Sequence, residues 1–138
     1  MHKDSTQPLT VTILAIFVLF ITFWNGLRIY SAIANWQVLK EFGANPVYLL
    51  ATGLFWTMAG LWLFRTIREG QRYAIRAGLT TAGLYTLWYW CDRLIFQPAP
   101  APNLLFSIVL SIVLLVCYII ILSLPATKAF FTGHKDTP

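Results

Sequence analysis

The sequence has little charge for its length. Only 11% of its 138 residues are Asp, Glu, Lys or Arg, whereas a typical soluble domain has about 25%. At the same time 58% of the residues are hydrophobic, and one small globule cannot enclose so many apolar side chains. The shortage of charge therefore excludes an ordinary soluble fold, and the apolar residues are expected to face lipid.

Residues that carry metal and redox chemistry are also scarce. The two histidines, His2 and His134, lie near the two ends of the chain, so no apolar segment offers a histidine to haem or a metal. Cys91 and Cys117 form no C-x-x-C motif, and their expected depths differ by about 20 Å, which is too far for a disulfide. The sequence also lacks a Gly-rich phosphate loop, an H-E-x-x-H motif and a Ser-His pair. We therefore expect no enzyme activity, no cofactor and no metal.

Long apolar runs are what the sequence does contain. A helix that crosses the hydrocarbon core of a bilayer, about 30 Å thick, needs roughly 20 mostly apolar residues. Four such runs are bounded by charge, Gly or Pro: 9–34, 46–68, 72–94 and 104–124. They predict an all-α fold in which residues 1–138 form a single domain, a bundle of four transmembrane helices. The first run is expected to be a retained helix rather than a cleaved signal peptide.

The segments outside the four runs are short. Residues 1–8 and 125–138 are expected to be polar tails. Between the first two runs, Trp36, Leu39 and Phe42 recur at i, i+3 and i+6 among polar residues. This spacing is typical of a short amphipathic helix that lies on the membrane surface.

The positions of Lys and Arg predict the topology, because short cytoplasmic loops hold an excess of positive charge. Seven basic residues fall on one side of the expected bundle: Lys3, Arg65, Arg68, Arg72, Arg76, Lys128 and Lys135. Three fall on the other side: Arg28, Lys40 and Arg93. Both termini are therefore expected in the cytoplasm, and the helices in the plasma membrane of a prokaryotic cell. The basic residues flank helix ends rather than forming a separate basic domain, so we expect no nucleic-acid partner.

Two ionisable residues lie within reach of the membrane, near its outer edge. Ionisable groups inside a bilayer are costly and often mark functional sites. One interpretation is an ion pair between Arg28 and Asp92 that closes the outer end of the bundle, or lines a small polar pocket with Asn25 and Tyr30. The alternative is that Arg28 reaches lipid headgroups and that Asp92 faces water.

Aromatic residues are abundant, at 16% of the chain. Several of them, including Tyr48 and Trp88, fall at the predicted outer interface, where rings with one wet edge are favoured. We expect these two rings to be interfacial anchors. Trp56 is expected to lie deeper in the membrane.

Small residues recur at helical spacing on the second and third runs, where they allow close approach of backbones. Two stripes result, Gly53, Thr57 and Gly60 on the second run, and Ala74, Gly78 and Ala82 on the third. We expect the second and third helices to pack against each other along them. On the fourth run Ser107, Ser111 and Tyr118 share a face that is expected to turn inward.

Two classes of function are compatible with these features. A small accessory, structural or assembly protein would act through helix packing with partner subunits or with copies of itself, in contact with the lipid bilayer. It needs only packing stripes and interfacial anchors, which the sequence supplies. The alternative is a small transporter or channel, which needs polar groups at the middle of the membrane on several helices.

Overall fold

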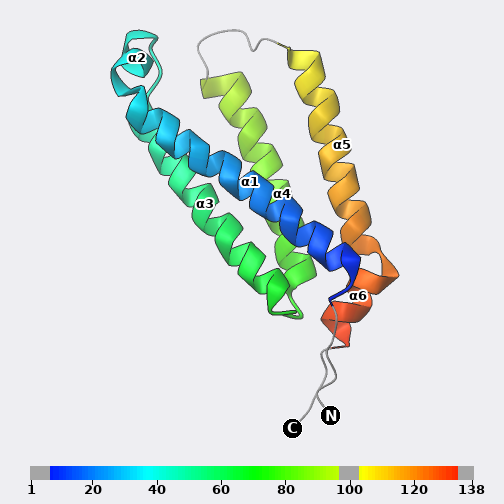
Figure 1. The fold of residues 1–138 in the computed structure, drawn as a ribbon. Coiled ribbons are helices and arrows are strands. Elements are labelled where there is room, and N and C mark those ends of the chain that lie inside the picture. Colours follow the sequence, from blue (N-terminus) through cyan, green and yellow to red (C-terminus); the bar gives the residue numbers. More distant parts are fainter. Residues whose placement is uncertain (1–6, 97–102, 134–138) are drawn as a thin grey trace.

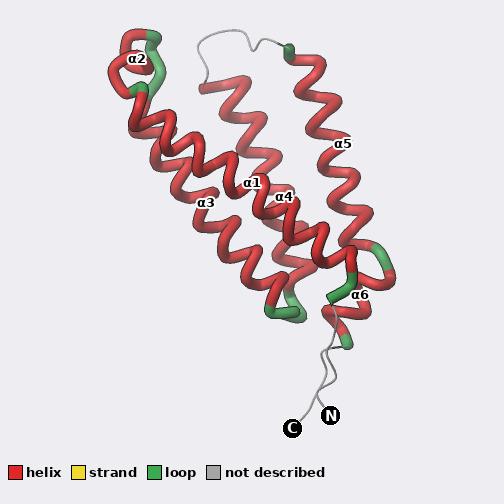
Figure 2. The backbone as a smooth tube through the Cα atoms, viewed as in Figure 1, coloured by secondary structure: helices red, strands yellow, loops and turns green. Residues whose placement is uncertain are grey.

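The computed structural model describes residues 7–96 and 103–133, and these residues form helices without any strand. The all-α expectation is confirmed. Figures 1 and 2 show long helices joined by short turns. The elements in chain order are α1 (Leu9–Ala34), α2 (Trp36–Glu41), α3 (Pro46–Arg68), α4 (Ala74–Cys91), the π-helix η1 (Asp92–Phe96), α5 (Leu104–Ser123) and α6 (Pro125–Thr132).

Three helices are long and apolar enough to cross a membrane, namely α1, α3 and α5. Within the described residues, α4 does not meet this criterion. It has 18 residues, and glycine, threonine and Arg76 dilute its apolar character. The third run was expected to be one helix over 72–94, but α4 begins at Ala74 and continues beyond Cys91 as η1.

The turns follow from local sequence. Asn45 caps α3, because its side-chain oxygen accepts hydrogen bonds from the backbone N–H groups of Val47 and Tyr48 at 3.0 and 3.2 Å. In the turn between α3 and α4, Gly70 has φ 64°, a value that favours glycine. Beside it, the hydrogen bond from Arg65 holds the pKa of Glu69 below its ordinary value.

The two ends of the bundle differ in how tightly they are packed. We call them the α6 end, which carries the start of α1, and the α2 end, which lies opposite (Figure 1). The buried apolar core lies at the α6 end: Val11, Leu14, Ala15, Val18, Leu63, Ile67, Ala74, Tyr118, Leu122 and Phe131. Toward the α2 end, α5 diverges from α1 (Figure 1).

The prediction of a polar tail from residue 125 is wrong over residues 125–132, because these residues form α6. Pro125 suits the first position of a helix, where no backbone N–H is needed. Phe131 is 1% exposed and belongs to the core. The two buried residues of α6, Thr127 and Phe131, are four residues apart and therefore share one face of the helix. Residues 134–138, and residues 1–6 of the other expected tail, lie outside the described residues.

The expected packing of the two small-residue stripes against each other is also wrong. Gly53 and Gly60 face α1: a Cβ atom at Gly53 would lie 2.9 Å from the side chain of Ile29, and one at Gly60 would collide with Thr22. Gly78 faces α5, since a Cβ atom there would lie 2.8 Å from the Tyr118 hydroxyl. Each stripe does allow a close approach, but to a different helix.

Aromatic rings fill the contact between α3 and α4 instead. The ring of Trp56 lies 5.0 Å from that of Tyr85, edge to face, and 5.4 Å from that of Trp88. Such pairs contribute about 0.5–1.5 kcal/mol beyond their buried area. These bulky contacts keep α3 and α4 farther apart than α1 and α3.

The glycines allow a matched test of the contact between α1 and α3. Gly60→Ala is expected to lower the free energy of unfolding in detergent by about 1–3 kcal/mol, because the new methyl group overlaps Thr22. Gly83→Ala, on α4, meets nothing within 4 Å and is expected to stabilise the helix by about 0.5–1 kcal/mol. Equal effects of the two substitutions would contradict this packing.

Candidate functional site

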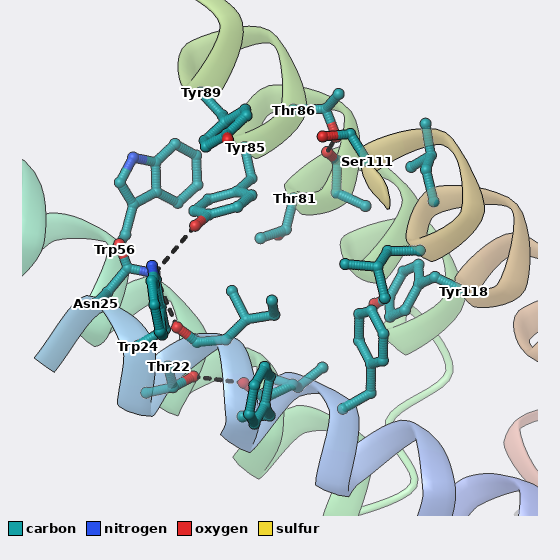
Figure 3. A pocket seen from close by; sticks show the side chains of 18 of the residues that line it. Thr22, Trp24, Asn25, Trp56, Thr81, Tyr85, Thr86, Tyr89, Ser111 and Tyr118 are labelled. Carbon is teal, nitrogen blue, oxygen red and sulfur yellow. Dashed lines mark hydrogen bonds between the residues drawn. The ribbon is translucent and has the colours of Figure 1, made fainter. Parts of the chain in front are cut away.

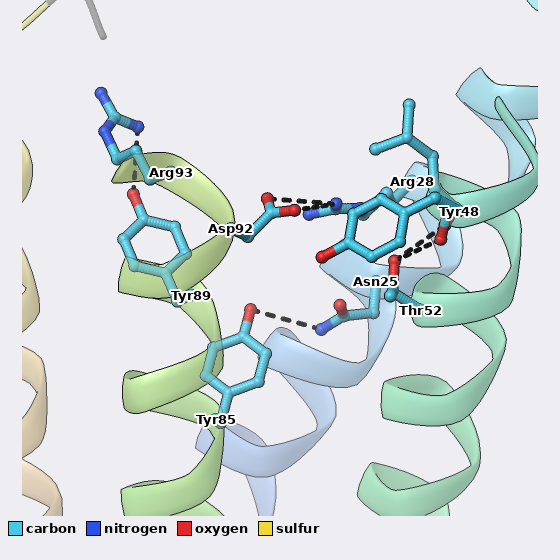
Figure 4. A network of polar contacts seen from close by, with 9 residues as sticks. Asn25, Arg28, Tyr48, Thr52, Tyr85, Tyr89, Asp92 and Arg93 are labelled. Carbon is cyan, nitrogen blue, oxygen red and sulfur yellow. Dashed lines mark hydrogen bonds and ion pairs between the residues drawn. The ribbon is translucent and has the colours of Figure 1, made fainter. Parts of the chain in front are cut away.

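Arg28 and Asp92 form an ion pair toward the α2 end of the bundle (Figure 4). Arg28 Nη2 donates to Asp92 Oδ1 at 3.3 Å and to Oδ2 at 3.2 Å. The Asp92 side chain is only 5% exposed and that of Arg28 is 21% exposed. The alternative interpretation, in which Asp92 faces water, does not describe this structure.

The surroundings of the pair are aromatic. The guanidinium carbon of Arg28 lies 4.9 Å from the centre of the Trp88 ring, which is the geometry of a cation–π contact. The side chain of Tyr48 on α3 also points toward the pair (Figure 4). The expectation that both rings are interfacial anchors stays a prediction; in the structure both rings lie against the ion pair. Their side chains exclude water, and this strengthens the electrostatic attraction between the two charges.

The site is under-satisfied in hydrogen bonds. Among the described residues, the buried Nε of Arg28 has no hydrogen-bond partner. Asp92 is the first residue of η1, where the helix widens. Short π-helical segments of this kind occur frequently at functional sites.

Asn25 extends the polar cluster along α1. Its Nδ2 donates to the Ile21 carbonyl at 2.8 Å and, at 3.4 Å, to the Tyr85 hydroxyl. Asn25 and Arg28 are three residues apart and therefore share a face of α1. Tyr30 was expected to join them but is 70% exposed. Tyr30 is two residues from Arg28 and therefore lies on nearly the opposite face of the helix. Helical spacing alone predicts this separation.

A groove of about 380 Å³ begins at Asn25 and Tyr85 and runs toward the α6 end between α1, α3, α4 and α5 (Figure 3). Phe20 and Trp24 of α1 and Leu110 of α5 line it and are 62%, 62% and 43% exposed. The groove therefore opens sideways between α1 and α5. We call it the lateral groove.

The lateral groove is apolar but carries hydroxyl groups. None of its described lining residues is Asp, Glu, Lys or Arg. Ser107, Ser111 and Tyr118 of α5 line it, as the sequence predicts for the inward face of that helix. At its inner limit the lining residues Val18 and Tyr118 also belong to the core, so the groove ends there.

Side chains that could hold a metal or react as thiols are few in the described part of the chain. In the described residues there is no group of three or more His, Cys, Asp or Glu side chains that could hold a metal. Cys91 and Cys117 are free thiols, as expected. Comparison of the chain with protein-family profiles, curated proteins and solved structures found no match.

A double-mutant cycle measures the contribution of the ion pair. Arg28→Ala and Asp92→Ala should each lower the free energy of unfolding in detergent, because each leaves a mostly buried charge without its partner. The double variant should lose less than the sum, with a coupling of about 1–2 kcal/mol. Glu41→Ala, on the exposed surface of α2, is the control and should show no coupling to Arg28. Additive effects of Arg28→Ala and Asp92→Ala would contradict a stabilising pair.

Proposed function

We propose that the chain is an integral membrane protein with four spanning helices, α1, α3, α4 and α5, and with both termini in the cytoplasm of a prokaryotic cell. Three of these helices meet the criteria of length and composition for a span. The proposal for α4 is supported by its course, because it runs from the α6 end to the α2 end beside the others (Figure 1). Its 18 residues extend about 27 Å, close to the thickness of the hydrocarbon core, about 30 Å.

Within this placement, we propose a non-enzymatic accessory role through lateral contacts with other membrane components, including partner subunits or a second copy of the chain. The lateral groove is the observation that carries this proposal. Lipid tails offer no hydrogen-bond partner to a hydroxyl group, whereas a hydroxyl group at a helix contact can hydrogen bond to a neighbouring helix. Ser107 and Ser111 line a groove that opens where a neighbour would lie.

Transport is the second class, and the geometry favours it less. A pathway for ions needs polar or charged groups along the whole depth of the membrane. The lateral groove instead ends on the apolar core at the α6 end. Its described lining also has no carboxylate that would couple transport to protons.

Reporter fusions test the placement in the membrane. A reporter fused after Pro138, and another inserted beside Gly70, should both report the cytoplasm. One inserted within residues 98–102 should report the outer side, because the basic residues are concentrated on the side of Gly70. An outer-side signal from the Gly70 insertion would overturn this topology.

Photo-crosslinking from two positions in native membranes tests the lateral contacts. A crosslinker at Leu110, on the rim of the groove, should give one discrete product: a partner protein, a dimer of the chain or a single lipophilic species. A crosslinker at Met58, which is 70% exposed on α3, is the control and should label bulk lipid only. Bulk lipid as the only product at both positions would contradict the accessory role.

A further inference from the structure

Tyr118, at the inner limit of the lateral groove, has a hydroxyl group with nothing to bind in the described part of the chain. The residue is 4% exposed, and its ring lies 5.5 Å from that of Phe17. Gly78 leaves the space that the hydroxyl occupies. A buried donor without an acceptor is costly, and such groups in a folded protein call for an explanation. An acceptor from outside the chain would satisfy it.

The other end of the groove is polar as well. The hydrogen bond from Asn25 to the Tyr85 hydroxyl is long, at 3.4 Å, and Tyr85 keeps its own O–H to donate. Two further aromatic residues line the groove: the ring of Phe17 lies 5.5 Å from that of Tyr118, and the ring of Trp56 lies 5.0 Å from that of Tyr85. Tyrosines thus line the groove near both ends, with the Tyr118 hydroxyl buried beside Gly78, and apolar side chains form its walls (Figure 3).

Charge and size restrict the occupant. An ionised headgroup would be unpaired against a lining without charged side chains, so the occupant is neutral. A volume of about 380 Å³ is at the small end of ligand pockets and suits one ring system rather than a whole lipid. The sideways opening admits a molecule that is dissolved in the bilayer. A saturated acyl chain would fit the walls but offers no acceptor to Tyr118.

The geometry points to a binding site for a neutral, ring-shaped lipophilic molecule with carbonyl acceptors, the chemical class of the isoprenoid quinones. The Tyr118 hydroxyl donates to one carbonyl oxygen, and the aromatic walls contact the ring. The substituent leaves the groove between α1 and α5 and enters the bilayer. This inference deepens the proposed function and rests on it, because it names the lateral contact as a small molecule. It involves binding alone.

Quenching of tryptophan fluorescence by a decyl-substituted benzoquinone tests the inference on the full-length protein in detergent. Trp24 and Trp56 line the groove, so a bound quinone should quench the emission in a saturable manner. Tyr118→Phe removes one hydrogen bond and should weaken binding about 3- to 10-fold. Tyr30→Phe removes a hydroxyl from a 70% exposed side chain outside the groove and should leave the affinity unchanged.

A steric block gives a second measurement, which holds even if Tyr118→Phe fails to fold. Ala82→Phe places a ring in the groove and should abolish saturable quenching, whereas Ala51→Phe, on the exposed face of α3, should not. Quenching that is linear and equal in all variants would overturn the inference. So would equal displacement of the quinone by decanol, which would identify an alkyl-chain site. Either result, with the reporter fusions as expected, refutes the quinone site and leaves the membrane placement standing.

Discussion

The close approach of α1 and α3 is the contact on which the rest of the structure depends. Gly53 and Gly60 let the two backbones meet, and this fixes the rotation of α1 about its axis. With that rotation set, Asn25 faces Tyr85 of α4 and Arg28 faces Asp92 of η1. A methyl group at Gly53 or Gly60 would require the side chain of Ile29 or Thr22 on α1 to shift, although neither glycine takes part in the polar cluster.

The bundle is held differently at its two ends, and the lateral groove is the consequence. Apolar side chains close the α6 end, with Phe131 of α6 completing the core. At the α2 end the ion pair joins α1 to η1, but no comparable contact between described residues ties α5 to α1. An ion pair joins two side chains only, whereas the side chains of a core fill the space between several helices. The space left between α1 and α5 is therefore open to the bilayer under the proposed placement.

Much of the architecture follows from the sequence, because apolar run length and helix-stop residues act locally. The helices over 9–34 and 46–68 have the predicted bounds, and the inward face of α5 follows from its spacing. The helix that packs against each small-residue stripe cannot be predicted from the sequence. The stripe at Gly78 shows that another helix can approach closely there, but not which helix does so. Trp88 is a similar case. A tryptophan near a helix end suits a membrane interface and can also contact a cation. Its contact with Arg28 depends on the approach of α1, which the sequence around Trp88 does not show.

The central claim is that the lateral groove is open to lipid and closed to water. A spin label at Ser111→Cys, in a chain with both native cysteines replaced by serine and inserted into bilayers, measures this directly by its relaxation with two collision partners. The account predicts strong relaxation by oxygen, which dissolves in the bilayer, and almost none by a water-soluble nickel chelate. Strong relaxation by the chelate would mean a water-filled pathway, and would contradict a groove that binds from the membrane.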